Sequence, residues 1–137
     1  MSETEETACA MEVERLHRVL EGWLSGAVPD TEAEFAVFAD SHAREFTLIT
    51  VDGAELARDR IMDGLRAAHG SAPELGIRTR DTRLVTAAGP VLVATFTELH
   101  SGTADARSRR CTAVFERAPD TPHGLRWRHL QETPLAT

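Results

Sequence analysis

The stretch that decides the fold is Pro90–Ser101, PVLVATFTELHS, in which β-branched and aromatic residues dominate, as is typical of a strand. Three further strand-like stretches lie around it, at about 75–86, 107–117 and 125–133. The segments between them are short and rich in Gly, Pro and Asp, and loops of this kind join neighbouring antiparallel strands. The second half of the chain therefore predicts an antiparallel meander.

The first half of the chain has a helical pattern instead. Residues 12–25 and 54–69 each carry one apolar stripe at helical spacing, and Thr31 with Glu34 has the spacing of a capping box, which predicts a short second helix. Residues 44–51 read as a strand that ends at the turn signal Asp52-Gly53. The order α-α-β-α-β-β-β-β is typical of the α+β class, with a curved antiparallel sheet packed on helices.

Length and composition limit the functions that are open to the chain. Its 137 residues predict one domain over residues 10–134, preceded by a disordered or frayed segment over residues 1–9. A formal charge of −7 argues against nucleic acid as a partner, and the absence of a long apolar run or a basic leader predicts a cytoplasmic protein without membrane contact. The sequence contains no Lys, Tyr or Asn, which excludes Schiff-base chemistry and a Tyr proton donor.

The helix pair, the strand ahead of Val51-Asp52-Gly53 and the closing strand Gly124–Thr133, GLRWRHLQET, carry a resemblance to a known family. The chain resembles the nuclear transport factor 2-like (cystatin-like) superfamily, in particular its SnoaL-like branch, over about residues 10–134. The resemblance implies a cone in which a curved sheet wraps a long helix, with a pocket at the open end and a homodimer contact on the outer face of the sheet. It does not select an activity, because this fold carries many functions. The ketosteroid isomerases, limonene epoxide hydrolases and scytalone dehydratases of the superfamily rely on Tyr, which this chain lacks.

The candidate pocket residues follow from strand alternation. Phe96, Glu98 and His100 share one strand face. On the last strand the residues with a common face are Trp127, His129 and Gln131. If both faces point into the cone, Glu98 and His129 are the candidate acid and base, and an apolar setting would raise the pKa of the Glu98 carboxyl. The alternative is that Glu98 and His100 face solvent or pair with Arg110 on the surface.

Two further residues, His42 and Phe46, lie where pockets of this fold take side chains from the first strand. Glu98 and His100 with His129 could supply metal ligands, but no metal motif supports them, and we predict neither a metal nor a cofactor.

Three hypotheses remain. The first is binding of a small, mostly apolar molecule by Phe46, Phe96, Trp127, His129 and Gln131, in a protein that forms a homodimer. The second is a cofactor-independent lyase or isomerase, of which a polyketide-cyclase-type enzyme is one form. The third is an association module that has no pocket.

Overall fold

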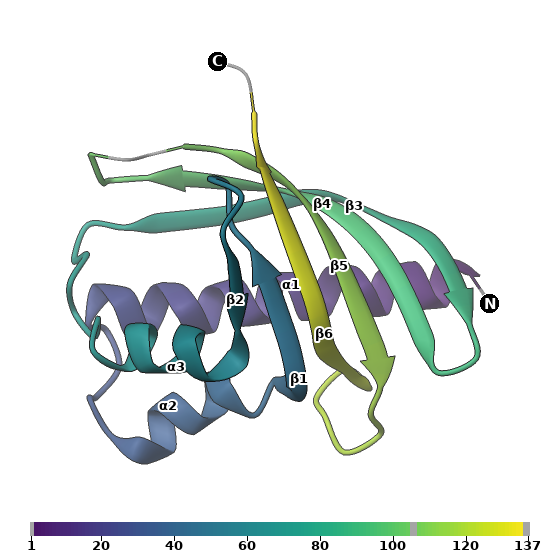
Figure 1. Cartoon of the computed structure of the whole chain (residues 1–137), viewed down its shortest axis with the longest axis horizontal. Coiled ribbons are helices and arrows are strands. Elements are labelled where there is room, and N and C mark those ends of the chain that lie inside the picture. Colours follow the sequence, from purple (N-terminus) through teal and green to yellow (C-terminus); the bar gives the residue numbers. More distant parts are fainter. Residues whose placement is uncertain (1, 105–106, 136–137) are drawn as a thin grey trace.

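The computed structural model describes residues 2–104 and 107–135, and it consists of three helices and one curved sheet (Figure 1). In chain order the elements are α1 (Ser2–Ser25), α2 (Glu32–Ala39), β1 (His42–Ile49), β2 (Glu55–Ala57), α3 (Arg58–Arg66), β3 (Gly76–Ala88), β4 (Val91–Ser101), β5 (Arg109–Arg117) and β6 (Leu125–Pro134). The predicted α+β cone is confirmed: the sheet curves around α1, and α2 and α3 lie at one end of it (Figure 1).

The sheet is mixed, with the strand order β2-β1-β6-β5-β4-β3. The predicted meander is present, because β3, β4, β5 and β6 pair in sequence order and antiparallel. The pairing of β1 with β6 is parallel, which the sequence pattern did not indicate. The fold class is as expected, and one strand pair, β1 with β6, is parallel instead of antiparallel.

The first helix is longer than its apolar stripe predicts. It begins at Ser2 instead of near Glu12, so residues 2–9 are helical where the sequence predicted a disordered or frayed segment; residue 1 lies outside the described residues. Two observations give the reason. Cys9 is fully buried in the core, and Glu3 and Glu5 in the first turn complement the helix dipole. Burial of one face therefore extends the helix to the chain end.

Residues 54–69 divide into a strand and a helix, where the sequence predicted one helix. The turn at Asp52-Gly53, with Gly53 at a φ of 84°, sends the chain back along β1, and the Thr50 amide donates to the Ala54 carbonyl over 2.9 Å. The three residues after Ala54 consequently pair with β1 as β2 before α3 starts. The predicted capping box of α2 is confirmed in part, because the Glu34 amide donates to Thr31 Oγ1 over 3.2 Å.

A β-bulge in β6 changes which residues of that strand face the core. Val114 of β5 pairs with His129, but the next residue, Phe115, pairs with Trp127, so Arg128 is an extra residue. An extra residue reverses the alternation of side chains beyond it. Trp127 lies inside the cone, and after the bulge the inward positions are Leu130 and Glu132.

The core is aromatic around Trp127, which is fully buried. Its ring lies edge-on to Phe96 and Phe115, with centroid distances of 6.2 and 4.7 Å. Its indole Nε1 donates to the buried carboxylate of Glu12 over 2.9 Å. This contact ties the last strand to α1 across 115 positions of the chain. Within the described residues no helix is both long and apolar enough to cross a membrane.

Candidate functional site

A pocket of about 350 Å³ lies at the end of the cone where α3 covers the sheet. Most of its wall is aliphatic or aromatic, and α1, α2, β1, β2, α3 and β6 all contribute apolar side chains. The apolar lining residues are Leu16, Leu20, Phe38, Phe46, Leu48, Leu56, Ile61, Leu65 and Leu130. Concave, mainly apolar pockets with a few convergent polar groups are the usual form of small-molecule sites. Five of the polar residues that line the pocket form a cluster, which we call the pocket floor: His17, Glu98, His100, Arg109 and Glu132.

The centre of the pocket floor is the carboxylate of Glu98, which is 2% exposed. Its Oε1 lies 2.7 Å from Nε2 of His17, and its Oε2 is in contact with Nε2 of His100. The Cys111 thiol donates to Oε1 over 4.0 Å. Burial alone would raise the pKa of Glu98, but the charge and hydrogen bonds of the two histidines hold it well below its usual range. Glu98 is therefore an ionised carboxylate that accepts from donors on three sides.

His17 is oriented from both of its ring nitrogens. Nδ1 lies 2.7 Å from the carbonyl of Val13, which can only accept, so Nδ1 carries a proton. Since Nε2 faces the Glu98 carboxylate, that contact also requires a proton between the two groups. Burial is the largest influence and lowers the pKa of His17, but the Glu98 charge together with the hydrogen bonds to Glu98 and Val13 outweighs it, and the net pKa is raised. The pair is consequently a buried imidazolium and carboxylate.

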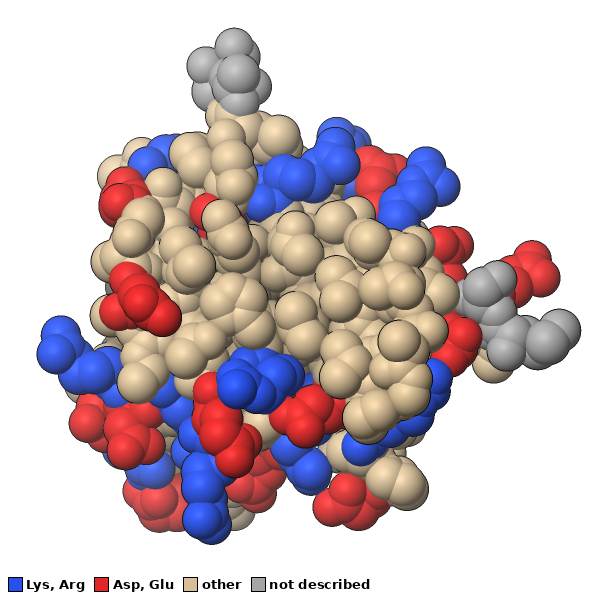
Figure 2. Space-filling view, turned by 45° about the vertical axis from the view of Figure 1, so that its right-hand side comes forward, with Lys and Arg blue, Asp and Glu red and all other residues tan. Residues whose placement is uncertain are grey.

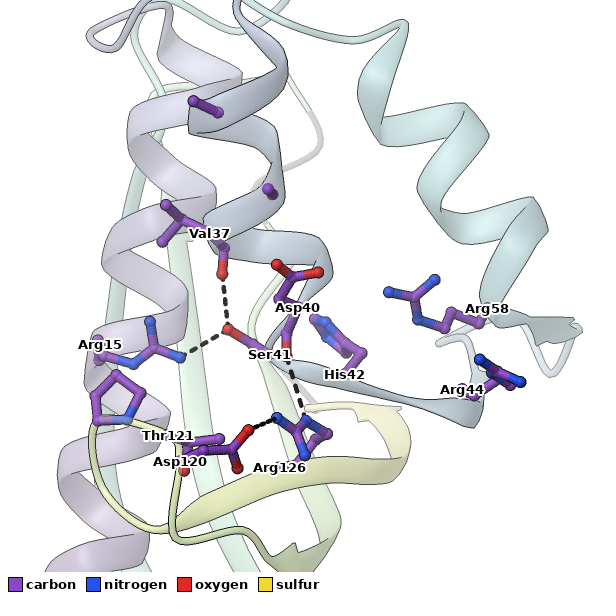
Figure 3. Close-up of a pocket in the computed structure, with 13 residues that line it drawn as sticks. Arg15, Val37, Asp40, Ser41, His42, Arg44, Arg58, Asp120, Thr121 and Arg126 are labelled. Atoms are coloured by element: carbon purple, nitrogen blue, oxygen red, sulfur yellow. Dashed lines mark hydrogen bonds and ion pairs between the residues drawn. The ribbon is translucent and has the colours of Figure 1, made fainter.

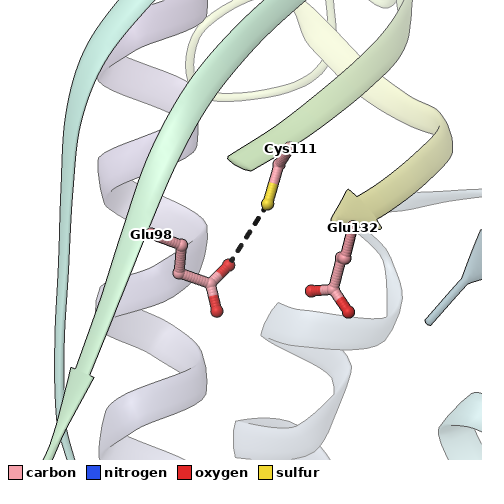
Figure 4. Close-up of side chains that lie close together, drawn as sticks. All are labelled: Glu98, Cys111 and Glu132. Carbon is pink, nitrogen blue, oxygen red and sulfur yellow. Dashed lines mark hydrogen bonds between the residues drawn. The ribbon is translucent and has the colours of Figure 1, made fainter. Parts of the chain in front are cut away.

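Glu132 is the second carboxyl of the floor, and its electrostatics are the reverse of those of Glu98. Figure 4 shows the two carboxyl groups on opposite sides of the Cys111 thiol. Burial raises the pKa of Glu132, and the negative charge of Glu98 raises it further. The nearest cation, Arg109, has Nη1 3.4 Å from Glu132 Oε1, and with His17 it offsets part of this rise. Glu132 is thus the carboxyl at the pocket floor that most readily holds a proton.

Glu98, Cys111 and Glu132 offer three possible metal ligand atoms within 4.8 Å of one another. The surroundings oppose a cation there. Arg109 already lies beside both carboxylates, with its Nε 3.8 Å from Glu98, and His17 adds a second positive charge. Burial also raises the pKa of the Cys111 thiol, which disfavours the thiolate that binds metals. This donor set does not fit a divalent metal.

Four of the residues predicted from the sequence line the pocket: His42, Phe46, Glu98 and His100. The alternative hypothesis, a surface ion pair of Glu98 with Arg110, is wrong. Glu98 is buried between His17 and His100. The pKa of Glu98 is lowered, where an apolar setting was expected to raise it, because two histidines contact it.

The other four predicted residues do not line this pocket. Phe96 and Trp127 are fully buried in the core behind it. His129 and Gln131 lie on the outer face of the sheet, where His129 Nδ1 is 2.7 Å from Thr47 Oγ1 and Gln131 is exposed. The expected convergence of Glu98 with His129 is therefore wrong, and its cause is the bulge at Arg128.

Sequence reasoning missed His17, Arg109 and Glu132. A signal for His17 was present, because it lies four residues after Val13 and one turn before Leu20, on the helix face that packs inward. No signal could have placed Glu132, because regular alternation turns it outward, and only the bulge turns it in.

A second hollow, of about 940 Å³, lies between α1, α2 and the start of β6, and four arginines line it (Figure 3). Three of these are engaged within the protein, and one of them, Arg58, donates to the Ala39 carbonyl over 2.7 Å. Arg15 contacts Glu12 and donates to Ser41 over 2.7 Å, and Arg126 pairs with Asp120. These contacts tie α1 to the segment between α2 and β1 and tie β6 to the β5–β6 loop, which makes the hollow a structural feature of this end of the cone.

No protein-family model matches the chain, and no curated protein matches it. Solved structures do. A nuclear transport factor 2-like protein of unknown function from Pseudomonas aeruginosa is 26% identical, with a TM-score of 0.84 over 94% of this chain and 99% of that one. A nuclear transport factor 2-like protein from Rhodospirillum rubrum, described as of unknown function in nutrient uptake, is 16% identical, with a TM-score of 0.68 over 93% and 98%. A putative calcium/calmodulin-dependent kinase II association domain from Exiguobacterium sibiricum is 12% identical, with a TM-score of 0.57 over 93% and 94%.

Proposed function

The chain belongs to the nuclear transport factor 2-like superfamily, and from this premise we propose that it binds a small, mostly apolar molecule in the pocket at the open end of its cone. The observation that carries the proposal is the pocket itself, an apolar wall around a buried, charged floor. Burying charged groups beside an empty apolar space is costly unless they are paired, and here they are held in a network. Such a floor gives a ligand a fixed set of polar partners.

The size of the pocket limits the ligand. About 350 Å³ corresponds to roughly a dozen water-sized groups, since a water molecule takes about 30 Å³ in the liquid. A single ring system or a medium-length alkyl chain fits this space. Larger molecules would have to project past α3.

Gly64 keeps the mouth of the pocket open. It lies within α3 and lines the pocket, and a Cβ built there would meet nothing within 4 Å. A glycine inside a helix costs about 1 kcal/mol relative to alanine. Close packing does not explain why a glycine is present here, because no neighbouring atom would contact a side chain. An entrance that must admit a ligand does explain it.

A ligand screen with a blocked variant tests the proposal. The wild-type protein is titrated calorimetrically with decanoate and with decan-2-one, and the same titrations are made on Gly64→Leu, whose side chain would narrow the mouth. Asp63→Leu is the matched control, because it adds the same side chain one residue away, on an exposed position that does not line the pocket. We expect binding to the wild type and to Asp63→Leu, and at least tenfold weaker binding to Gly64→Leu. Equal affinity of the two variants, or no binding to the wild type, would overturn the proposal.

The raised pKa of Glu132 supports a second candidate, a cofactor-independent lyase or isomerase. A general acid or base works best with a pKa near the working pH, and Glu98, whose pKa is lowered, does not meet this condition. Glu132 would then exchange protons with carbon next to a carbonyl group. In D2O, NMR should show that the protein speeds the loss of the α-protons of decan-2-one and that Glu132→Gln does not. No acceleration by the wild type would remove this candidate.

The outer face of the sheet supports homodimer formation, which we propose as the protein's assembly. Figure 2 shows a broad area of this side without charged side chains, with charged groups around its border. Residues on this face include Val93, Thr95, Leu99, Thr112, Val114, His129 and Gln131. Light scattering coupled to size-exclusion chromatography should give a molar mass of two chains for the wild type. The variant Val114→Glu should give the mass of one chain. Val85→Glu, at a position 60% exposed on β3, should leave the dimer intact. A wild-type monomer would refute the assembly, and a dimer with an empty pocket would favour the association module.

A further inference from the structure

We infer that the ligand brings a hydrogen-bond-accepting oxygen, of a carbonyl or carboxylate group, to Arg109 and Glu132 at the pocket floor. This inference rests on the proposed binding function and names the chemistry of the ligand's polar end. It follows from a count of the donors and acceptors that the floor leaves unused.

Glu98 has little capacity left for a ligand. Oε1 accepts from His17 and from the Cys111 thiol, and Oε2 accepts from His100. The side chain is also 2% exposed, which leaves a ligand almost no access to it. The Glu98 carboxylate, which faces inward from its strand, thus already accepts its hydrogen bonds from the protein.

Arg109 has donors to spare. Its Nη1 is 3.4 Å from Glu132 and its Nη2 is 3.3 Å from the Arg107 carbonyl, both longer than the usual 2.9–3.0 Å of such bonds. Its Nε is buried and has no hydrogen-bond partner among the described residues, since Glu98 Oε2 is 3.8 Å away. Buried donors are nearly always satisfied, so an unsatisfied one calls for an explanation. An oxygen that reaches the guanidinium would complete its hydrogen bonds after a small rotation of the side chain.

When it holds a proton, Glu132 also offers a hydrogen-bond donor to a ligand. Its side chain is 11% exposed and lines the pocket, and burial together with Glu98 raises its pKa. A protonated carboxyl donates one hydrogen bond. Arg109 and Glu132 therefore present donors, side by side, to one point of the pocket.

The remaining charged groups that line the pocket also favour an oxygen over a cation. Arg60 of α3 lies on the wall, and the imidazolium of His17 lies on the floor, so positive charge meets a ligand from two helices. His42 of β1 is uncharged at neutral pH, because burial lowers its pKa to about 4. An ammonium group would have to sit beside Arg109, and like charges in a buried setting repel strongly.

The test compares three probes that differ only at the polar end: decanoate, decan-2-one and decylamine. Each is titrated calorimetrically into the wild type, Arg109→Gln and Glu132→Gln. The control is Arg110→Gln, the same substitution at the next residue, whose side chain is exposed on the opposite face of β5. We expect the two oxygen-bearing probes to bind the wild type at least tenfold more tightly than decylamine. Arg109→Gln should weaken the binding of these two probes at least tenfold, and Arg110→Gln should leave it unchanged. Glu132→Gln keeps a hydrogen-bond donor and should therefore still bind decan-2-one.

The outcomes separate the two proposals. Tightest binding of decylamine, or oxygen-bearing probes that bind Arg109→Gln as well as the wild type, would overturn the assignment of the polar end while leaving the pocket a binding site. The ranking of the probes on the wild type decides this even if Arg109→Gln fails to fold. No binding of any probe would overturn the proposed function and this inference with it.

Discussion

His42 should make the protein less stable in mild acid, and replacing it should remove that effect. The ring is 6% exposed and lies among Phe38, Phe46 and Trp127, with centroid distances of 4.7, 4.6 and 6.3 Å. Nδ1 donates to the Phe38 carbonyl over 2.9 Å, which fixes the orientation of the ring. Burial, aided by the charge of Arg58, lowers the pKa of His42 to about 4.

The size and sign of the effect follow from this pKa. In the unfolded chain the pKa of His42 is about 6.5, so the unfolded state binds a proton at this residue below that pH. The native state binds the same proton only when the pH falls to about 4. The free energy of unfolding should therefore fall as pH falls from 6.5 to 4, and this contribution should be constant above and below that window. At about 1.4 kcal/mol per pH unit, His42 costs about 2 kcal/mol at pH 5 and about 3 kcal/mol at pH 4.

Urea unfolding followed by Trp fluorescence, at pH 7 and pH 5, measures this contribution. Relative to the wild type, His42→Phe should gain about 2 kcal/mol between the two pH values, whatever its stability at pH 7. The comparison with the wild type cancels other groups that titrate in this range, such as Glu132, whose raised pKa acts in the opposite direction. Phe46→Leu disturbs the same ring cluster without removing a titrating group and should show no such gain. A difference between wild type and His42→Phe that does not change with pH would show that our account of this histidine is wrong.

One substitution addresses the pocket floor, and one deletion addresses the bulge. Glu98→Gln removes the charge that His17 is paired with and should lower the free energy of unfolding by about 3 kcal/mol, because a buried charge loses its partner; urea unfolding measures it. Glu116→Gln on the partly exposed surface of β5 should change stability by less than about 1 kcal/mol, and equal losses would contradict a buried ion pair. Deletion of Arg128 removes the extra residue and leaves Leu130 and Glu132 as the inward positions after Trp127, so the variant should still unfold cooperatively in urea; a deletion variant that fails to fold would contradict the assignment of Arg128 as the extra residue.

Local sequence signals were sufficient for most of the secondary structure. The alternation in Pro90–Ser101 predicted β4, Thr31 with Glu34 predicted the start of α2, and the turn at Asp52-Gly53 predicted the end of β1. These features depend on residues a few positions apart, and the resemblance supplied the cone. Alternation in β4 left two orientations open, and the structure has the one in which Phe96, Glu98 and His100 all point inward.

The pocket floor depended on contacts that no local pattern contains. Glu98 and His17 are 81 residues apart, and their separation of 2.7 Å reverses the direction of the Glu98 pKa that an apolar setting would give. The extra residue at Arg128 is defined only by the pairing of β6 with β5, and it exchanges His129 and Gln131 for Leu130 and Glu132 inside the cone. Sequence alone determined most of the strands and helices, because propensity and turn geometry act locally. Tertiary structure decided which face of β6 lines the pocket and which carboxyl stays ionised, because strand register and charge pairing act between residues that are distant in the chain.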